Sequence, residues 1–338
     1  MGSEGDSDRL VHVYKGVPGQ LCVCDQALRQ LPGGERLIVF MTGGDTEPRR
    51  ENYIALCRSA DGGATWSPPE PVLRYDDRAC LLSEVIVNGD AVTVFGVSHE
   101  GRFEDWRNFT LTSPDGGRTW GEPRPFEPAP RRAFVRNLCV SSWGTWYLPV
   151  QSYDVRPDAG ISPLHDGSHA EGVNYVLISE NEGLTWSPSE KVRAPKGWCE
   201  NNAVELSDGR LTMLVRADGT GSLQRSDSAD RGSTWSPYRD SGIPNPGAKF
   251  RLHGLRDGRI LLIHNANATP GQRHPLSLWL SDDDMATWGY RRTITGFPGQ
   301  LAYPDGFVDD NEDWVHFAFD YNRHDLIAVS AAIPRPGA

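Results

Sequence analysis

The sequence has few lysines and a surplus of acidic residues. Only four of its 34 basic residues are lysine, and 45 acidic residues give the 338-residue chain a formal net charge of −11. This balance disfavours nucleic acids and anionic membrane surfaces as partners, because phosphate binding requires clustered positive charge. Arginine suits bidentate binding of a carboxylate. The composition therefore leaves room for a small anionic ligand in a local arginine pocket.

The chain also lacks a membrane span and a paired-cysteine motif. No stretch approaches the roughly 20 apolar residues that a helix needs to cross a bilayer, and the N-terminal MGSEGDSDRL has no apolar signal-peptide core. Six cysteines lie mostly in apolar, strand-like runs, and none forms a CxxC pair. Such cysteines are typical of a reduced protein core. We therefore expect a cytoplasmic protein, and secretion stays open if a signal peptide has been removed.

One eight-residue phrase occurs five times along the chain. SADGGATW at residues 59–66 recurs as SPDGGRTW at 113–120, SENEGLTW at 179–186, SADRGSTW at 228–235 and SDDDMATW at 281–288. The tryptophans that end these phrases are 49 to 66 residues apart, which fits one four-stranded β-propeller blade per repeat. The Asp or Asn can accept hydrogen bonds within its own turn, Gly permits a positive φ, and Trp can pack beneath the hairpin. The phrase is therefore expected to be structural rather than catalytic.

Short strand-like runs between the phrases predict six blades. The sixth has no repeated phrase and no fourth strand, whereas the leading segment RLVHVYKG is a strand without a blade. Pairing of this segment, about residues 10–15, with the last blade would close the ring and remove both exposed edges. We predict an all-β fold, a single six-bladed β-propeller over residues 1–338, in which residues 1–9 form a flexible tail. The inner strands are expected to begin near Cys22, Ala79, Phe134, Glu200, Phe250 and Ala302.

Strand parity places the long loops on one face of this ring. In an up-and-down blade, the turn between strands 1 and 2 and the repeated phrase lie on one side. The chain enters strand 1, and connects strands 2 and 3, on the other. That second side, the upper face, carries the long polar loops, such as residues 43–52, 152–174 and 264–276. Long loops on a rigid scaffold commonly carry binding and catalysis, so we expect the site there, near the axis.

The inner strands begin with polar groups, which is unusual for the centre of a sheet protein. Each hydroxyl of a sugar needs a hydrogen-bond partner once it leaves water, so this lining predicts a carbohydrate partner. The polar positions are Asp25, Gln26, Ser83, Glu84, Arg136, Asn137, Glu200, Asn201, Asn202, Arg251, His253, Tyr303 and Asp305.

The repeated phrase resembles the Asp-box of sialidases and related β-propellers, and further segments extend the resemblance over about residues 20–330. WCENNAVELSDGRLTMLVRADG is similar to the family segment that supplies a Glu and an Arg, here Glu200 and Arg216. NATPGQRHPLSLWLSDDD is similar to the segment with a later Arg of the carboxylate-binding triad, Arg273. LAYPDGF is similar to the segment with the nucleophilic tyrosine, Tyr303. The resemblance implies that Glu200 activates Tyr303, because a phenol of pKa about 10 is a weak nucleophile without a base.

Two features of the family have no matching residue in the sequence. Sialidases begin with an Arg-Ile-Pro stretch whose Arg completes the triad, whereas this chain has Gly16-Val17-Pro18. The family's acid/base Asp lies on the upper loop of the first blade, which here offers Asp45 and Glu47. We take Asp45 as the third catalytic candidate, with Tyr303 and Glu200. The predicted substrate-binding residues are Arg216, Arg273, Arg251, Arg136, Asp25, Asn201, Asp305, His264, Arg323 and His324.

Three functions are compatible with these residues. We favour an exo-acting glycoside hydrolase of the sialidase superfamily on an acidic or polar sugar, and the missing Arg argues against classical sialidase activity. The second is a polysaccharide lyase on a uronate, in which Tyr303 or a histidine exchanges a proton and Arg neutralises the carboxylate. The third is a non-catalytic carbohydrate-binding propeller. The histidine candidates for the lyase are His99, His169, His253, His264, His274 and His324.

No cofactor or metal is expected. The spacing His165-Asp-Gly-Ser-His169 lies on a loop without a supporting ligand set. The glycine pair before Asp45 lacks the strand and helix context of a nucleotide-binding loop. The predicted partner is therefore the carbohydrate alone.

Overall fold

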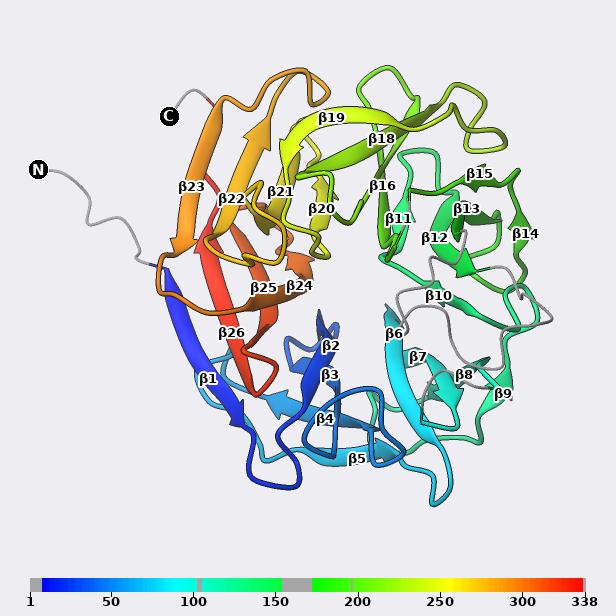
Figure 1. The fold of residues 1–338 in the computed structure, drawn as a ribbon, viewed down its shortest axis with the longest axis vertical. Helices are drawn as coiled ribbons and strands as arrows, with labels where there is room; N and C mark the ends of the chain where they lie inside the picture. The colour runs from blue at the N-terminus through cyan, green and yellow to red at the C-terminus, as the bar shows by residue number, and fades with distance from the viewer. Residues whose placement is uncertain (1–7, 102–104, 154–171, 196, 337–338) are drawn as a thin grey trace, which may run out of the picture.

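Six antiparallel sheets surround a central axis in the computed structural model (Figure 1). The structure describes residues 8–101, 105–153, 172–195 and 197–336. Within these residues every regular element is a strand, which confirms the all-β prediction. No helix in the described part of the chain has the length and apolarity to cross a membrane.

The first three blades follow one another around the ring, each with its inner strand at the axis (Figure 1). In the third blade both the inner and the outer strand are split in two. The strands are β2 (Val23–Gln30), β3 (Arg36–Thr42), β4 (Tyr53–Ser59) and β5 (Glu70–Leu73); β6 (Ala79–Asn88), β7 (Ala91–His99), β8 (Arg107–Ser113) and β9 (Arg124–Pro125); then β10 (Ala133–Val135), β11 (Cys139–Val140), β12 (Trp146–Tyr153), β13 (Gly172–Ser179), β14 (Ser187–Pro188) and β15 (Val192–Arg193).

The last three blades complete the ring and contain no such split. The strands are β16 (Asn201–Glu205), β17 (Leu211–Val215), β18 (Ser222–Ser228) and β19 (Arg239–Pro244); β20 (Arg251–Gly254), β21 (Ile260–Asn265), β22 (Leu276–Ser281) and β23 (Tyr290–Thr295); then β24 (Leu301–Val308), β25 (Trp314–Tyr321), β26 (Asp325–Ala332) and β1 (Arg9–Lys15).

The N-terminal strand closes the ring, as predicted. β1 pairs antiparallel with β26, from Arg9 opposite Ser330 to Lys15 opposite Asp325 (Figure 1). Two residues of the predicted tail instead belong to the ring: Arg9 is part of β1, and the Asp8 carboxylate lies 2.6 Å from the guanidinium of Arg292. Residues 1–7 lie outside the described part of the chain.

Each repeated phrase forms the same self-contained turn. Asp61 Oδ1 accepts hydrogen bonds from the backbone N–H groups of Ala64 and Thr65 at 2.9 Å, and its Oδ2 accepts one from the Thr65 hydroxyl at 2.6 Å. Ser59 Oγ accepts the N–H of Gly63, which has a φ of 85°. The boxes at Ser113, Ser179, Ser228 and Ser281 repeat the Ser and Thr contacts. These bonds confirm the structural role of the phrase.

Apolar side chains fill the spaces between neighbouring blades. One cluster joins the first blade to the second and the sixth through residues such as Phe40, Val94 and Ala328. Another joins the fourth and fifth blades and includes Trp279 and Trp288. Because each blade buries its faces against its neighbours, the ring holds the inner strands in a fixed arrangement around the axis.

Irregularities in the inner strands occur where the polar residues lie. The pairing register shifts between Cys24 and Ala27 in β2, and between Ala302 and Asp305 in β24. Asp25 and Tyr303 in these intervals have φ values of 47° and 58°, a region that a bulky residue adopts at a cost in energy. The third blade interrupts its inner strand at residues 136–138. Bulges re-aim side chains, and here they accompany side chains that reach the axis.

Candidate functional site

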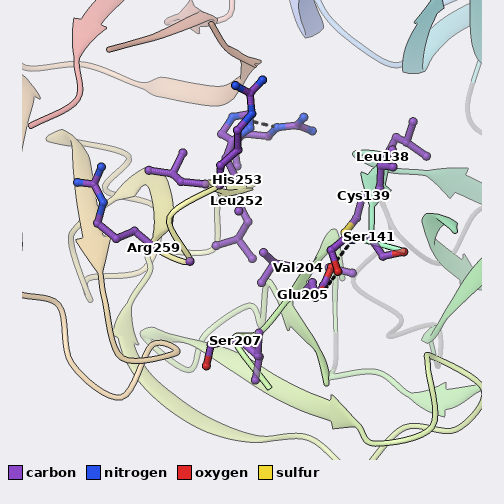
Figure 2. Close-up of a pocket in the computed structure, with 18 residues that line it drawn as sticks. Leu138, Cys139, Ser141, Val204, Glu205, Ser207, Leu252, His253 and Arg259 are labelled. Atoms are coloured by element: carbon purple, nitrogen blue, oxygen red, sulfur yellow. Dashed lines mark hydrogen bonds between the residues drawn. The ribbon is translucent and has the colours of Figure 1, made fainter. Parts of the chain in front are cut away.

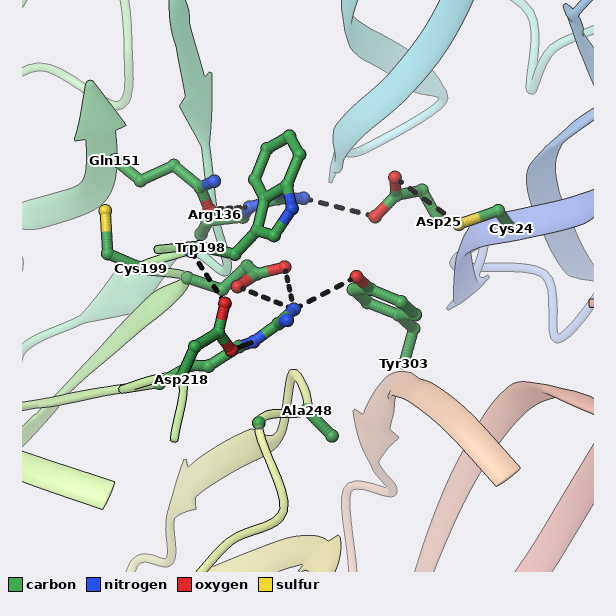
Figure 3. A network of polar contacts seen from close by, with 12 residues as sticks. Cys24, Asp25, Arg136, Gln151, Trp198, Cys199, Asp218, Ala248 and Tyr303 are labelled. Atoms are coloured by element: carbon green, nitrogen blue, oxygen red, sulfur yellow. Dashed lines mark hydrogen bonds and ion pairs between the residues drawn. The ribbon is translucent and has the colours of Figure 1, made fainter. Parts of the chain in front are cut away.

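A small cavity of about 160 Å³ opens among the upper ends of the inner strands. Its residues come from all six blades, and Figure 3 shows Asp25, Arg136 and Tyr303 among the polar groups that surround it. We call it the upper cavity. It is lined by Asp25, Glu47, Leu81, Phe134, Arg136, Trp198, Glu200, Arg216, Arg273, Tyr303 and Arg323.

Glu200, Arg216 and Tyr303 meet in this cavity, although they come from the fourth and sixth blades. Arg216 Nη1 lies 3.1 and 3.3 Å from the two carboxylate oxygens of Glu200, and 3.3 Å from the hydroxyl of Tyr303 (Figure 3). Its Nε donates to Asp218 at 2.7 Å. No direct hydrogen bond joins Tyr303 to Glu200 among the described residues, so the guanidinium bridges the predicted nucleophile and base.

Electrostatics separate the protonation states of these two groups. Burial, and after it the Glu200 carboxylate, raise the pKa of Tyr303 to about 12, against the opposing effect of three arginines. Burial alone would also raise the pKa of Glu200, but Arg216 and Arg136 bring it below its ordinary value. At neutral pH the site therefore holds a neutral phenol beside an ionised carboxylate, the states that a nucleophile and its base require.

Two arginines stack on the ring of Tyr303. The guanidinium carbon of Arg323 lies 4.5 Å from the ring centroid and that of Arg273 lies 5.4 Å from it. Cations held over a phenol ring favour its anionic form as well as attracting its face. The four positions that the resemblance assigned to the site thus lie together in the upper cavity: Tyr303, Glu200, Arg216 and Arg273.

Arg323 adds a third arginine beside Arg216 and Arg273. It lies in the turn between β25 and β26, where its carbonyl accepts a hydrogen bond from the N–H of Val23 at 2.9 Å. Its Nη2 is 3.2 Å from a Glu47 oxygen, and its Nη1 contacts the Cys24 sulfur. The sixth blade therefore supplies a guanidinium next to the first inner strand, where the sequence offers no Arg-Ile-Pro arginine.

Arg273 differs from the other arginines of the upper cavity in its partners. Arg136, Arg216 and Arg323 each form an ion pair with a carboxylate. In the described part of the chain Arg273 forms none, and its Nη2 donates to the Gly247 carbonyl at 3.1 Å. Its positive charge is thus available to an anionic ligand.

The opposite wall combines an ion pair with an apolar surface. Arg136 Nη1 lies 3.3 Å from Asp25, and its guanidinium stacks 4.5 Å from the ring centroid of Phe134. Trp198 stands beside Arg136 in Figure 3, and its ring is 6.4 Å from that of Phe134. Sequence reasoning missed Trp198, Phe134 and Leu81 as lining residues. The position of Trp198, two residues before Glu200, was the available signal.

Other predicted site residues lie outside the upper cavity. Asp45 is exposed and accepts a hydrogen bond from the Gly19 N–H at 2.6 Å, while Glu47 of the same loop lines the cavity. His324 is exposed in the turn that carries Arg323. Asn201 and His264 are fully buried and bond to the carbonyls of Val150 and Pro244 respectively.

Two further predicted substrate-binding residues, Asp305 and Arg251, do not line the upper cavity. The Asp305 carboxylate is 2.7 Å from Arg29 and 3.5 Å from Lys249. Arg251 lines a second cavity, at the other end of the inner strands (Figure 2). No histidine lines the upper cavity among the described residues, and His169 lies outside them.

Three potential metal ligands meet at the edge of the upper cavity. Atoms of Cys24, Asp25 and Glu47 lie within 4.8 Å of one another. The Arg323 guanidinium already contacts Cys24 and Glu47, and burial raises the pKa of the Cys24 thiol well above its ordinary value. A fixed cation and a protonated thiol both weaken a site for a metal ion, so the geometry favours an arginine-centred ion pair.

The six-bladed propeller with Asp-box turns, and the tyrosine, glutamate and three arginines at its axis, are features of the sialidase superfamily. The BNR repeat-like domain matches residues 33–316, and the chain belongs to this family within the sialidase superfamily. A sialidase of Micromonospora viridifaciens is 27% identical over 244 residues, which cover 62% of this chain and 35% of that protein. The chain thus spans about a third of the length of this relative.

Solved structures agree with the fold. The Hadza microbial sialidase Hz136 superposes with a TM-score of 0.75 at 16% identity, covering 93% of this chain and 66% of that one. A Trypanosoma rangeli sialidase in complex with sialic acid gives a TM-score of 0.68 at 16% identity, covering 96% of this chain and 59% of that one. At these sequence identities the similarity establishes the propeller fold alone. The chemistry has to be inferred from the residues of the upper cavity.

Proposed function

We propose that the protein is an exo-acting glycoside hydrolase that removes a terminal sugar bearing a carboxylate. The observation that carries this proposal is the convergence of Arg216, Arg273 and Arg323 around Tyr303 and Glu200. Three guanidiniums can hold a carboxylate by charge-assisted, bidentate hydrogen bonds. The sialic acid complex of the Trypanosoma rangeli sialidase supports a sugar ligand for this fold.

The size of the upper cavity supports action at a chain end. Its volume of about 160 Å³ is below the 300 to 1,000 Å³ typical of pockets for drug-sized ligands. It suits one sugar ring, whose apolar face and hydroxyls would meet Trp198, Phe134 and the surrounding polar groups. The rest of the glycan would leave through the mouth.

The chemistry follows from the protonation states of the site. Glu200 is ionised beside Arg216, and in the substrate complex it must come within hydrogen-bond reach of the Tyr303 hydroxyl. It then takes the phenol proton as Tyr303 attacks the anomeric carbon, and a glycosyl–tyrosine bond forms as the glycosidic bond breaks. Glu47 is the carboxylate nearest solvent, with 24% of its side chain exposed. In its protonated form Glu47 gives a proton to the departing oxygen, and the carboxylate that results then draws a proton from the water that cleaves the intermediate.

The experiment compares 4-methylumbelliferyl glycosides of sialic acid, of a uronic acid and of a neutral hexose. We expect turnover of an acidic sugar, and at least about a 10³-fold loss in Tyr303→Phe with an unchanged melting temperature. Tyr321→Phe is the matched control, because the Tyr321 hydroxyl bonds to the Pro298 carbonyl, away from the cavity. Faster turnover of the neutral sugar would refute the proposed recognition of a carboxylate. Undiminished activity of Tyr303→Phe would refute the role of Tyr303 as the nucleophile. Binding without turnover would favour a carbohydrate-binding propeller.

A further inference from the structure

A second and larger cavity, of about 450 Å³, lies at the lower ends of the inner strands of the third, fourth and fifth blades (Figure 2). β16 connects the two cavities: it begins next to Glu200 and ends at Glu205, which lines the second one. Five residues of extended strand span about 16 Å. This lower cavity is therefore separate from the proposed sugar site, and its function does not depend on that proposal.

Arg251 is the buried charge of the lower cavity. It is 8% exposed, and its Nε donates to Nε2 of His253 at 3.3 Å. Its Nη1 is buried and has no hydrogen-bond partner, and Arg251 forms no ion pair within the described residues. Burial lowers the pKa of Arg251, but a guanidinium keeps its charge in proteins. Arg251 thus carries a full positive charge inside the protein, and its Nε donates to a neutral ring nitrogen.

The neighbouring buried carboxylates pair directly with other cations. Arg29 pairs with both Glu84 and Asp305, and Lys249 lies 3.5 Å from the same Asp305. Among the described residues Arg29 and Lys249 thus share the carboxylates of Glu84 and Asp305, and Arg251 forms an ion pair with neither. Burying an unpaired charge costs several kcal/mol.

Glu205 is the one carboxylate that lines the lower cavity in the described part of the chain, and it does not pair with Arg251. Glu205 accepts hydrogen bonds from the N–H of Ser142 at 2.6 Å and from its hydroxyl at 2.7 Å. His253 adds a donor instead of an acceptor: its Nε2 accepts the Arg251 bond, so Nδ1 carries the proton. Burial and Arg251 lower the pKa of His253 well below its ordinary value, which keeps the ring neutral in this tautomer.

We propose that the lower cavity binds a small oxyanion of the phosphate type. The oxyanion accepts hydrogen bonds from the Arg251 guanidinium and from Nδ1 of His253, and it supplies the ion-pair partner that Arg251 lacks among the described residues. The volume of about 450 Å³ accommodates phosphate alone or a phosphate carried on a small metabolite.

Calorimetric titration with inorganic phosphate, at constant ionic strength in a zwitterionic buffer, tests this site. We expect the wild type to bind, and Arg251→Met to bind about 10- to 100-fold more weakly, as for other lost charge-assisted hydrogen bonds. His253→Gln should weaken binding to a smaller degree. Arg239→Met, at an exposed ion pair with Asp227, is the matched control and should leave phosphate affinity unchanged, whereas Arg273→Met shows whether any phosphate binds in the upper cavity. Titration with glucose 6-phosphate then shows whether a carried phosphate binds more tightly than the free ion.

Each alternative outcome is decisive. Absence of phosphate binding to the wild type overturns the proposal, as does a loss of affinity in Arg273→Met but not in Arg251→Met. Equal affinity for chloride would overturn the oxyanion assignment. In phosphate-free buffer Arg251→Met should melt no lower than the wild type, because it removes an unpaired buried charge. A lower melting temperature would instead assign Arg251 a structural role, and if this variant does not fold, His253→Gln decides the question.

Discussion

The Asp-box turns and the upper ends of the inner strands show opposite patterns. In every box a Ser, an Asp or Asn and a Thr make contacts within four residues of one another, so each turn is complete in itself. At the inner ends each blade presents different side chains, and their partners come from other blades. Arg136 of the third blade pairs with Asp25 of the first, for example.

This difference separates residues that build the scaffold from residues that form the site. A local contact set can be repeated unchanged, because each copy satisfies its own hydrogen bonds. A cavity at the axis needs one copy of each group, so the corresponding positions diverge. Recurrence in this chain therefore marks structure, and divergence at equivalent positions marks the candidate site.

The largest expected effect contrasts the pH response of a carboxylate from each region. Burial raises the pKa of Asp320, next to Arg323, to about 7. The native state therefore retains a proton that the unfolded chain loses near pH 4, and stability falls as pH rises from about 4 to 7. Asp320→Asn removes this dependence, so its unfolding free energy should rise relative to the wild type by up to about 4 kcal/mol over that interval. Urea denaturation from pH 4 to 8 measures it.

Asp61 provides the control with the opposite sign. Hydrogen bonds from Thr65 and Ser59 hold the pKa of this Asp-box carboxyl below its ordinary value. Its stabilising contribution is therefore complete above about pH 4 and is lost as pH falls below it. From pH 5 to 8 the unfolding free energy of Asp61→Asn should therefore change with pH in parallel with that of the wild type. Parallel profiles for Asp320→Asn and the wild type would contradict the raised pKa.

A smaller effect is the difference in stability loss between tryptophan variants of two boxes. Trp288 is 8% exposed and packs within the cluster that includes Trp279, whereas Trp66 is half-buried at the edge of its cluster. Trp288→Ala should lower the unfolding free energy by roughly 3–5 kcal/mol, and Trp66→Ala by about half as much, because less apolar surface is lost. Denaturant unfolding of both variants measures this difference. Equal losses of unfolding free energy would mean that the stabilisation by each tryptophan comes from its contacts within the hairpin and not from the extent of its burial.

The same contrast explains what could be predicted from the sequence. The repeated phrase and the unpaired leading strand predicted the six blades and their closure, because both depend on local patterns. The places of Glu200, Arg216, Arg273 and Tyr303 on one face followed from strand parity. Arg323 was a candidate by its loop, but its position beside Cys24 and Glu47 depends on ring closure. Arg251 was expected on the upper face by its place at the start of β20, and its side chain instead reaches the lower cavity.

The smallest expected effect concerns the one box with Asn in place of Asp. Asn181 Oδ1 accepts the Thr185 N–H at 2.9 Å, and its Nδ2 donates to the Thr185 hydroxyl at 2.9 Å. In the other boxes the threonine hydroxyl donates to a carboxylate oxygen, a charge-assisted bond that is stronger than the neutral one. Asn181→Asp should therefore raise the unfolding free energy, but by less than about 1 kcal/mol because the turn is exposed. Thermal unfolding at pH 7 measures the gain, which should disappear below pH 4 as the new carboxylate is protonated. A gain that persists in acid, or a loss at pH 7, would show that the boxes are not interchangeable local units.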